Sequence, residues 1–310
     1  MHEGSKRAIF AAFLANLGIA IAKFVGFLIT GASSMLAEAI HSLADTTNQG
    51  LLFFGGRQAA RPATPEHPFG YGRDRYFWSF VVAMVLFSVG GLFAMYEGIE
   101  KLRHPHDIDS PAVAFVILGV AVVLESFSLR TAVRESNHVR GKLGWVSFVR
   151  RSKTPELPVV LLEDLAALLG LFFAITGLGL AVALDEPRWD GAATVAIGAL
   201  LVTVAVILVV EMKSLLIGES AGPEQQRAIL GAIEETPGVR RLIHMRTLHL
   251  GPDELLVAAK IELAGSLSVQ GVAETIDAAE GRIRSAVPIA RVIYLEPDLF
   301  SPAQATPDGV

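Results

Sequence analysis

The feature that most constrains this chain is a series of long apolar stretches, all of which lie before residue 215. Each is long enough for an α-helix that crosses the hydrocarbon core of a bilayer, which takes about 20 residues. Backbone groups inside lipid must satisfy their hydrogen bonds within the protein, so such stretches are helical. We therefore predict six membrane-spanning helices, at about residues 8–30, 33–56, 77–99, 112–133, 157–184 and 191–212.

The composition agrees with a membrane protein. Hydrophobic residues make up 52% of the chain and charged residues 18%, against roughly 25% charged residues in a typical soluble protein. The net charge is −5, which argues against nucleic acid as a partner. Cysteine is absent, and this excludes disulfides and thiolate metal sites. Any bound metal must therefore use nitrogen and oxygen ligands.

Basic residues in the connections predict the orientation of the spans. Thirteen Lys and Arg lie on the side of the N-terminus and three lie in the opposite connections. Because positive residues collect on the cytoplasmic side, we expect both termini in the cytoplasm and a multi-pass protein of the cell (inner) membrane. The first span is too long for a signal peptide, so we expect no cleavable signal. The basic inner loop at about 134–156 is predicted to be either a short surface helix or a solvated loop.

After Gly218 the pattern changes to that of a small polar domain. Residues 254–263 alternate between apolar and polar side chains, which is typical of a strand with one buried face. The expected order is helix, strand, strand, helix, strand, at 222–235, 240–250, 254–263, 272–283 and 291–296. This order favours an α+β domain with its helices on one face of a sheet. The predicted division is a membrane domain, a cytoplasmic domain that forms a dimer and a disordered tail, at 1–217, 218–300 and 301–310.

The second predicted span carries ionisable side chains on one face. At about 100° per residue, Glu38, His41, Asp45 and Asn48 fall within a sector of about 80°. His41 and Asp45 are one helical turn apart, a spacing at which two side chains can bind one metal ion. Ionisable groups in a span are costly and by default indicate function. The alternatives are a hydrated Glu38 near the outer interface and a His41–Asp45 hydrogen bond that joins helices.

A second acidic pair, Glu163 and Asp164, lies in the fifth predicted span. Unpaired carboxylates in lipid are costly, which favours contact between this pair and the polar face of the second span. Adjacent residues point about 100° apart on a helix, so we expect only one of the two to face that target.

Three further polar side chains lie in the first and fourth predicted spans. We expect Asn16 to form a hydrogen bond between helices and Lys23 to extend toward the outer surface of the membrane. For Glu125 the two alternatives are an ion pair with Arg130 near the inner surface and a part in proton passage.

In the order and spacing of these features, the chain resembles the cation diffusion facilitator family of divalent-metal transporters, in the branch related to zinc transporter 9. The resemblance covers six spans, cytoplasmic termini, the His41–Asp45 motif, an Asp in the fifth span and a ferredoxin-like cytoplasmic tail. The segments Glu66–Arg73 and Tyr96–Leu102 are similar to further family signatures. The resemblance implies a homodimer, bathed in membrane lipid, that exchanges a divalent cation for protons. Zn²⁺ is the expected substrate, and neither an enzyme activity nor a tightly bound cofactor is implied.

In that family, two residues from the second span and two from the fifth coordinate the ion, each pair spaced by four. Carried onto this chain, the ligands are His41, Asp45 and Asp164, and the fourth position falls on Val160, which cannot bind a metal. The resemblance therefore implies three protein ligands and water, or a fourth ligand from among Glu163, Asn48 and Glu38. Zinc accepts mixed nitrogen and oxygen ligands. The incomplete set keeps manganese, iron and cobalt as alternatives.

The family's other metal positions are poorly matched. His67 occupies a loop position that binds zinc in relatives, but a neighbouring histidine position is Tyr71. The tail has His244 and His249 away from the family's ligand positions, and Tyr294 and Glu296 stand where His and Asp are typical. We expect the tail to form a dimer through apolar contacts, without a metal-loaded interface.

Two functions outside transport are also considered. An intramembrane metal-dependent hydrolase needs a general base and normally a pair of histidines, whereas His41 is the one histidine within a predicted span. A non-transporting membrane scaffold leaves the intramembrane acids unexplained, although a family member that lacks a ligand is compatible with it.

Overall fold

The structure is a computed structural model that describes residues 3–301, with side chains from residue 16 onward. Its contacts form two units. One contains the chain up to Gln58 together with Arg75–Lys213, and the other contains Ala59–Asp74 together with the chain from Ser214. The tail predicted at 301–310 lies outside the described residues apart from Ser301.

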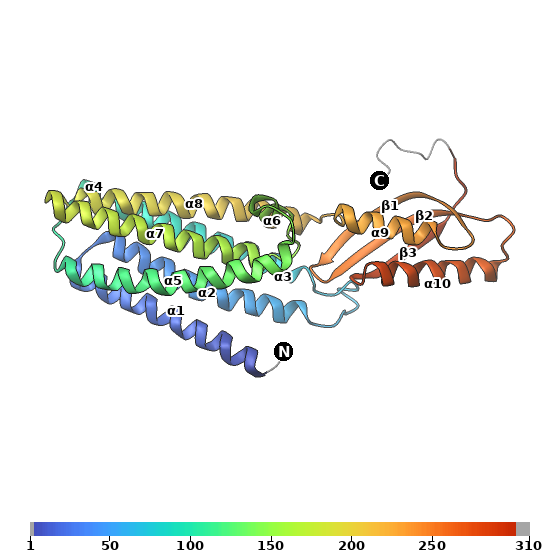
Figure 1. The fold of residues 1–310 in the computed structure, drawn as a ribbon, viewed down its shortest axis with the longest axis horizontal. Coiled ribbons are helices and arrows are strands. Elements are labelled where there is room, and N and C mark those ends of the chain that lie inside the picture. The colour runs from blue at the N-terminus through green and yellow to red at the C-terminus, as the bar shows by residue number, and fades with distance from the viewer. Residues whose placement is uncertain (1–2, 302–310) are drawn as a thin grey trace. The chain divides into compact units, whose positions relative to one another are not determined.

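The first unit is a bundle of long helices (Figure 1). The helices α3, η1 and α4 form one continuous span, in which η1 is a π-helical segment. Together with the other long helices they fall on the six stretches predicted from sequence. The elements are α1 (Glu3–Thr30), α2 (Ser33–Ala59), α3 (Asp74–Val85), η1 (Leu86–Leu92), α4 (Phe93–Arg103), α5 (Pro111–Arg140), α6 (Trp145–Arg151), α7 (Glu156–Leu184) and α8 (Arg188–Ile217).

Length and hydropathy identify four helices among the described residues that are able to cross a membrane. They are Asp74–Arg103, Pro111–Arg140, Glu156–Leu184 and Arg188–Ile217. The described apolar part of α1, Asn16–Thr30, is shorter. α2 does not meet the same criterion, because the ionisable side chains of its polar face lower its hydropathy.

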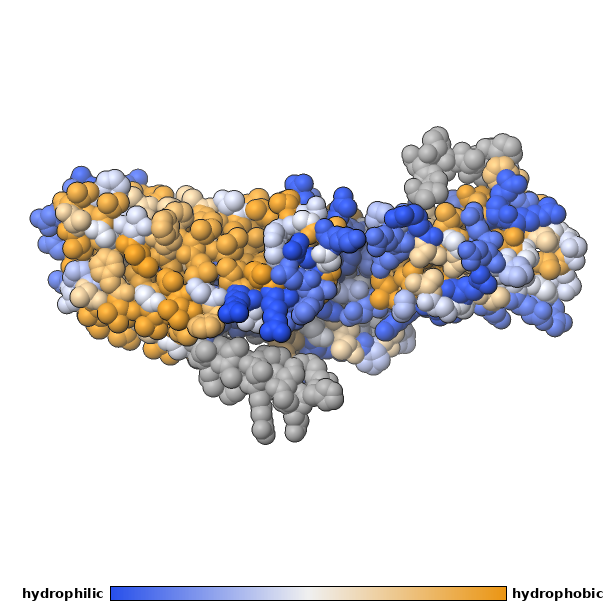
Figure 2. All heavy atoms as spheres, in the orientation of Figure 1, coloured by the Kyte–Doolittle hydropathy of each residue, from blue (hydrophilic) through white to orange (hydrophobic). Residues whose placement is uncertain are grey.

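The outer surface of this bundle is apolar, as expected for helices that contact lipid. Figure 2 shows apolar side chains spread over its visible surface, and Phe127 and Phe172 are 63% and 62% exposed. Inside, small residues let the helices approach closely, as in other membrane proteins. A Cβ atom on Gly98 would lie 2.6 Å from the backbone nitrogen of Val195, so α4 and α8 meet almost backbone to backbone.

The basic loop contains the short helix α6, so a helix forms there, and its place at a membrane surface stays a prediction. Phe148 is 2% exposed and packs against Ala132 of α5 and Leu161 of α7. Phe148 therefore joins α6 to the bundle.

The second unit contains a three-stranded sheet with two helices. Its elements are α9 (Pro223–Glu234), β1 (Val239–Gly251), β2 (Glu254–Leu263), α10 (Val269–Ala286) and β3 (Ala290–Pro297). The strand order is β1-β2-β3, with β1 and β2 antiparallel and β2 and β3 parallel. A parallel pair needs a crossover connection, which α10 supplies. The predicted fold class, a helical membrane protein followed by a small α+β domain, is confirmed.

The predicted alternation along β2 is also confirmed, because every second residue of the strand is buried. Leu255, Val257 and Ile261 are 0% exposed and form the core of this unit with Ile229 of α9 and Ile283 of α10. α9 contacts β1, α10 contacts β3, and the two helices contact each other. Both helices therefore cover the same face of the sheet.

The connection between α2 and α3 packs against the turn between β1 and β2. A Cβ atom on Gly72 would lie 2.8 Å from the carbonyl oxygen of Leu250, and one on Gly251 would lie 3.0 Å from the Cα atom of Gly72. This close approach explains why the segment Glu66–Arg73 needs glycine at position 72.

Candidate metal site

The polar face of α2 lies inside the bundle, as its spacing predicted. Glu38, His41 and Asn48 are 0% exposed. The register of the helix is fixed at its start by Asp190 of α8. The Asp190 carboxylate accepts the backbone N–H of Ser33 at 2.7 Å and that of Ser34 at 3.3 Å, and it also accepts the Ser34 hydroxyl. A carboxylate at a helix N-terminus satisfies free N–H groups and interacts favourably with the helix dipole.

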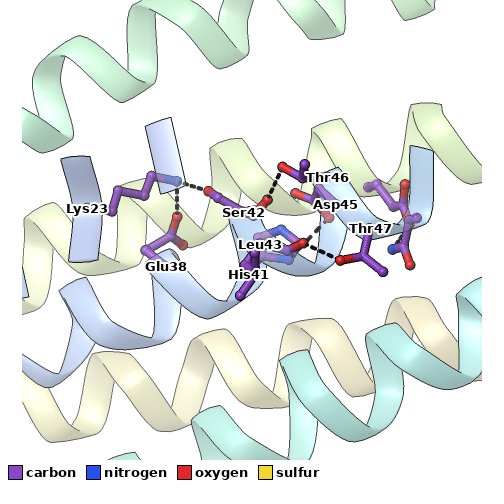
Figure 3. Close-up of polar contacts among 10 residues, drawn as sticks. Lys23, Glu38, His41, Ser42, Leu43, Asp45, Thr46 and Thr47 are labelled. Atoms are coloured by element: carbon purple, nitrogen blue, oxygen red, sulfur yellow. Dashed lines mark hydrogen bonds and ion pairs between the residues drawn. The ribbon is translucent and has the colours of Figure 1, made fainter. Parts of the chain in front are cut away.

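His41 and Asp45 lie side by side on α2 with unused binding capacity (Figure 3). The distance from His41 Nδ1 to Asp45 Oδ1 is 3.6 Å, which is too long for a hydrogen bond. Among the described residues, neither ring nitrogen of His41 has a hydrogen-bond partner, and neither does Asp45 Oδ1. Buried polar atoms without partners are costly, so these atoms mark a position at which a ligand would be stabilising.

A small cavity lies beside this pair. It is lined by carboxylates from three helices, Asp45 of α2, Glu125 of α5 and Glu163 with Asp164 of α7, and by Asn16, Ser42, Gln49 and Val160. The volume of the cavity is about 10 Å³, which is close to the lower limit for one water molecule. Carboxylates of this number around so small a space suit a cation.

Both acids of α7 line the cavity, and among the described residues Glu163 is the one of the two that is hydrogen-bonded to the polar face of α2. Each acid has a hydrogen-bond partner on a neighbouring helix. Asn48 Nδ2 of α2 donates to Glu163 Oε1 at 2.7 Å, and the Ser128 hydroxyl of α5 donates to Asp164 Oδ2 at 2.9 Å. The two carboxylates are thus held by different helices at the same cavity.

The predicted ligands therefore converge only in part. Asp45, Asp164 and Glu163 line one cavity and His41 adjoins Asp45, but within residues 16–301 no three His, Asp or Glu side chains are close enough to hold one metal ion. Val160 also lines the cavity. Of the replacements considered for it, Glu163 faces the cavity, whereas Asn48 is hydrogen-bonded to Glu163 and Glu38 is paired elsewhere.

Lys23 is placed differently from the sequence expectation. It does not extend to the surface but is 0% exposed, and its Nζ donates to Glu38 Oε2 at 2.9 Å and to Ser42 Oγ at 2.8 Å. The reason is that Glu38, on the facing helix, offers a partner that lowers the cost of burying both charges. The expectation of a hydrated Glu38 at the interface is therefore wrong as well. Glu125 and Asn16 line the cavity.

Outside the bundle, the other predicted positions have local partners. The His67 ring packs against Tyr71, with 4.7 Å between ring centroids and an angle of 59° between the ring planes. Glu296 of β3 forms an ion pair at 2.9 Å with Lys260 of β2, which also contacts Asp298 at 3.0 Å. Hydrogen bonds to Glu296 and Asp298 raise the pKa of Lys260 above its ordinary value.

Comparison with known proteins agrees with this architecture. Residues 9–217 match the family model of the cation efflux transmembrane domain, and residues 221–298 match that of the cation efflux protein cytoplasmic domain. The human mitochondrial proton-coupled zinc antiporter SLC30A9 is 32% identical over 277 residues, which are 89% of this chain and 49% of that protein.

Two more distant relatives have other names. Metal tolerance protein C4 of Arabidopsis thaliana is 26% identical over 86% of this chain and 59% of its own length. Magnetosome protein MamB of Magnetospirillum gryphiswaldense is 24% identical over 97% of this chain and 95% of its own length. The chain spans about half the length of the zinc antiporters that it matches. It belongs to the cation efflux family, the cation diffusion facilitators that its motifs resemble, and is a multi-pass integral membrane protein.

Proposed function

We propose that this protein exchanges Zn²⁺ for protons across a membrane, through a site formed by His41, Asp45, Asp164 and Glu163. The observation that carries the proposal is the cavity inside the bundle, where Asp45 meets both acids of α7 beside a buried His41 that lacks hydrogen-bond partners within the described residues. The name of the human relative, a proton-coupled zinc antiporter, supports the same substrate and the same coupling.

In this proposal Glu163 replaces the ligand that Val160 cannot supply. One imidazole nitrogen and three carboxylates form a mixed set of the kind that Zn²⁺ accepts in tetrahedral geometry. Since Asn48 holds Glu163 by Oε1, the other carboxylate oxygen is available to the ion. The side chains must close in around Zn²⁺ when it binds, because they do not stand at coordinating distances. Manganese, iron and cobalt are the alternative substrates.

Protons and the metal compete for the same atoms in this site. A carboxylate must be ionised and an imidazole nitrogen must be free for the cation to bind, so metal binding displaces protons and proton binding displaces the metal. When the site opens to a side with more protons, the ion is released there and protons enter. Movement of the helices that exposes the site alternately to the two sides then produces exchange.

The remaining assignments belong to the same proposal. Both termini and the domain at 218–300 face the cytoplasm, or its topological equivalent, at the cell (inner) membrane. The match of residues 221–298 to the cytoplasmic domain of cation efflux proteins supports a homodimer joined through that domain.

Reconstituted vesicles test this proposal. The purified protein is placed in liposomes that contain a zinc-sensitive dye and a pH-sensitive dye, and the two signals are followed after zinc addition. We expect zinc influx with proton movement in the opposite direction. Zinc influx without proton movement rejects the exchange, and faster influx of manganese, iron or cobalt reassigns the substrate.

Ligand variants locate the site. We test four single variants: His41→Ala, Asp45→Asn, Asp164→Asn and Glu163→Gln. Loss of a residue that only supports a metal ligand weakens metal binding by about 10- to 100-fold. Each of these variants removes a proposed ligand, so we expect a larger loss of zinc affinity. Asp185→Asn, the same chemical change at an exposed position between α7 and α8, serves as the matched control and should bind as the parent does. Unchanged binding in Glu163→Gln removes Glu163 from the ligand set, and unchanged binding in all four variants rejects the site.

A further inference from the structure

A buried ion pair adjoins the wall of the cavity without lining it. Lys23 of α1 bridges Glu38 and Ser42 of α2 (Figure 3), and both members of the pair are 0% exposed. Ser42 itself lines the cavity. The ammonium group of Lys23 is therefore one hydrogen bond away from the space that the carboxylates surround.

The pair lies on one side of the cavity along the helix axis. On α2, Glu38 precedes Asp45 by about two turns, toward the start of the helix at Ser33. Gln49, which also lines the cavity, follows Asp45 by about one turn, toward the end of the helix. An ion that leaves Asp45 toward the start of α2 therefore meets the Lys23–Glu38 pair, and an ion that leaves in the other direction does not.

The helix α7, which carries the other two residues of the proposed site, contacts the same pair. The Glu38 carboxylate lies against Gly170 of α7, where a Cβ atom would overlap with Glu38 Oε1. That oxygen has no hydrogen-bond partner among the described residues. α1, α2 and α7 thus meet at one carboxylate, about two turns from the cavity on α7, and the absence of a side chain at position 170 is what allows it.

We propose that Lys23 and Glu38 form a gate that closes the cavity at the end where α2 begins. This inference rests on the proposed function, because a gate at one end of the cavity has a role in transport only if the cavity binds the transported ion. In the closed state the paired side chains obstruct that end of the cavity, with the Lys23 ammonium bonded to Ser42 of the cavity wall and Glu38 compensating its charge. Two buried charges are stable only while they are paired, so the pair separates when that end of the bundle admits water. The ion pair is therefore intact only while that end of the bundle is closed to water.

Cysteine accessibility tests the gate directly, since the chain has no cysteine of its own. Gln49→Cys places a single thiol in the cavity on the far side from the pair. In sealed vesicles of each orientation, a membrane-impermeant thiol reagent then reports how readily the cavity is reached from either end. The test variant is Lys23→Met with Glu38→Gln, which replaces the ion pair with uncharged side chains of similar size. Lys23→Arg, which keeps a charge on the pair, is the control.

We expect the double variant to be labelled about tenfold faster, or more, from the end where α2 begins, because the closed state loses a charge-assisted hydrogen bond. Labelling from the other end should not change, and Lys23→Arg should label as the parent does. Equal rates in the parent and the double variant would show that the pair only joins α1 to α2 and would overturn the gate. Gly170→Ala, which displaces Glu38 without removing a charge, gives the same comparison if the double variant does not fold.

Zinc binding separates this inference from the proposed function. In detergent, the double variant should bind zinc as the parent does, because neither Lys23 nor Glu38 is a ligand. Loss of binding as large as that of His41→Ala would make the pair part of the binding site and would overturn the gate. If His41→Ala itself retains binding, the proposed function fails, whereas the labelling rates still decide whether the pair closes the cavity.

Discussion

Replacement of Asp190 should destabilise the bundle through the helix that carries His41 and Asp45. The carboxylate accepts the N–H groups of Ser33 and Ser34, and it is 0% exposed. Asp190→Ala takes the partner from three buried donors, the two N–H groups and the Ser34 hydroxyl, each at a cost of about 1–3 kcal/mol. It also removes a charge at the start of α2 worth about 0.3–1 kcal/mol. We therefore expect the free energy of unfolding to fall by about 3–5 kcal/mol, since partial relaxation recovers some of the upper limit.

Equilibrium unfolding in mixed micelles, with helix content followed by circular dichroism, measures this loss. Asp190→Asn keeps one acceptor oxygen and should lose about half as much. Glu186→Ala is the control, because the Glu186 side chain is 45% exposed and its ion pair with Arg188 is long, at 3.9 Å. Such a pair contributes about 0–1 kcal/mol. A loss below about 0.5 kcal/mol in Asp190→Ala, the range of ordinary surface substitutions, would refute the argument that Asp190 holds the start of α2.

Three further outcomes follow from the packing and the charges. Gly98→Ala puts a Cβ atom 2.6 Å from the backbone nitrogen of Val195 and should lower the free energy of unfolding by about 1–3 kcal/mol; a stability equal to that of the parent would contradict the contact between α4 and α8. Gly72→Ala meets the carbonyl oxygen of Leu250 and should speed proteolytic cleavage of the connection between α2 and α3, while resistance as in the parent would show that this connection does not need the contact. The pKa of Lys260 is raised in the folded protein, so its contribution to stability is complete below its ordinary pKa of about 10.4 and is lost as the pH rises through the folded value. The difference in melting temperature between the parent and Lys260→Met should therefore be constant from about pH 8 to 10 and narrow above that; a difference that does not depend on pH would contradict it.

The sequence was sufficient to predict those features that depend on the composition of one segment or on the periodicity of its apolar residues. The spans follow from the length of apolar stretches, because a lipid surface accepts nothing else. The strand β2 follows from the alternation of Leu255, Val257 and Ile261 with polar residues, because a sheet buries every second side chain. His41 and Asp45 were placed together correctly, because residues four apart on a helix are neighbours whatever surrounds them.

Contacts between different helices could not be predicted from the sequence in the same way. Lys23 and Glu38 have opposite charges in consecutive spans, which is a signal for a buried pair, but either residue alone fits an exposed position near the surface. The pair depends on where α1 crosses α2, and no period in the sequence encodes that. The positions of Glu163 and Asp164 likewise depend on Asn48 and Ser128, which lie on two other helices.

The amino-acid sequence by itself therefore determined the membrane helices, the order of the α+β domain and the polar face of α2, since each of these depends on the spacing of residues along one segment. Only the tertiary structure decided that acids from α2, α5 and α7 surround one cavity and that Lys23 closes onto Glu38 beside it. The physical reason is that an electrostatic interaction depends on distance and burial, and both are set by how separate helices pack rather than by any one of them.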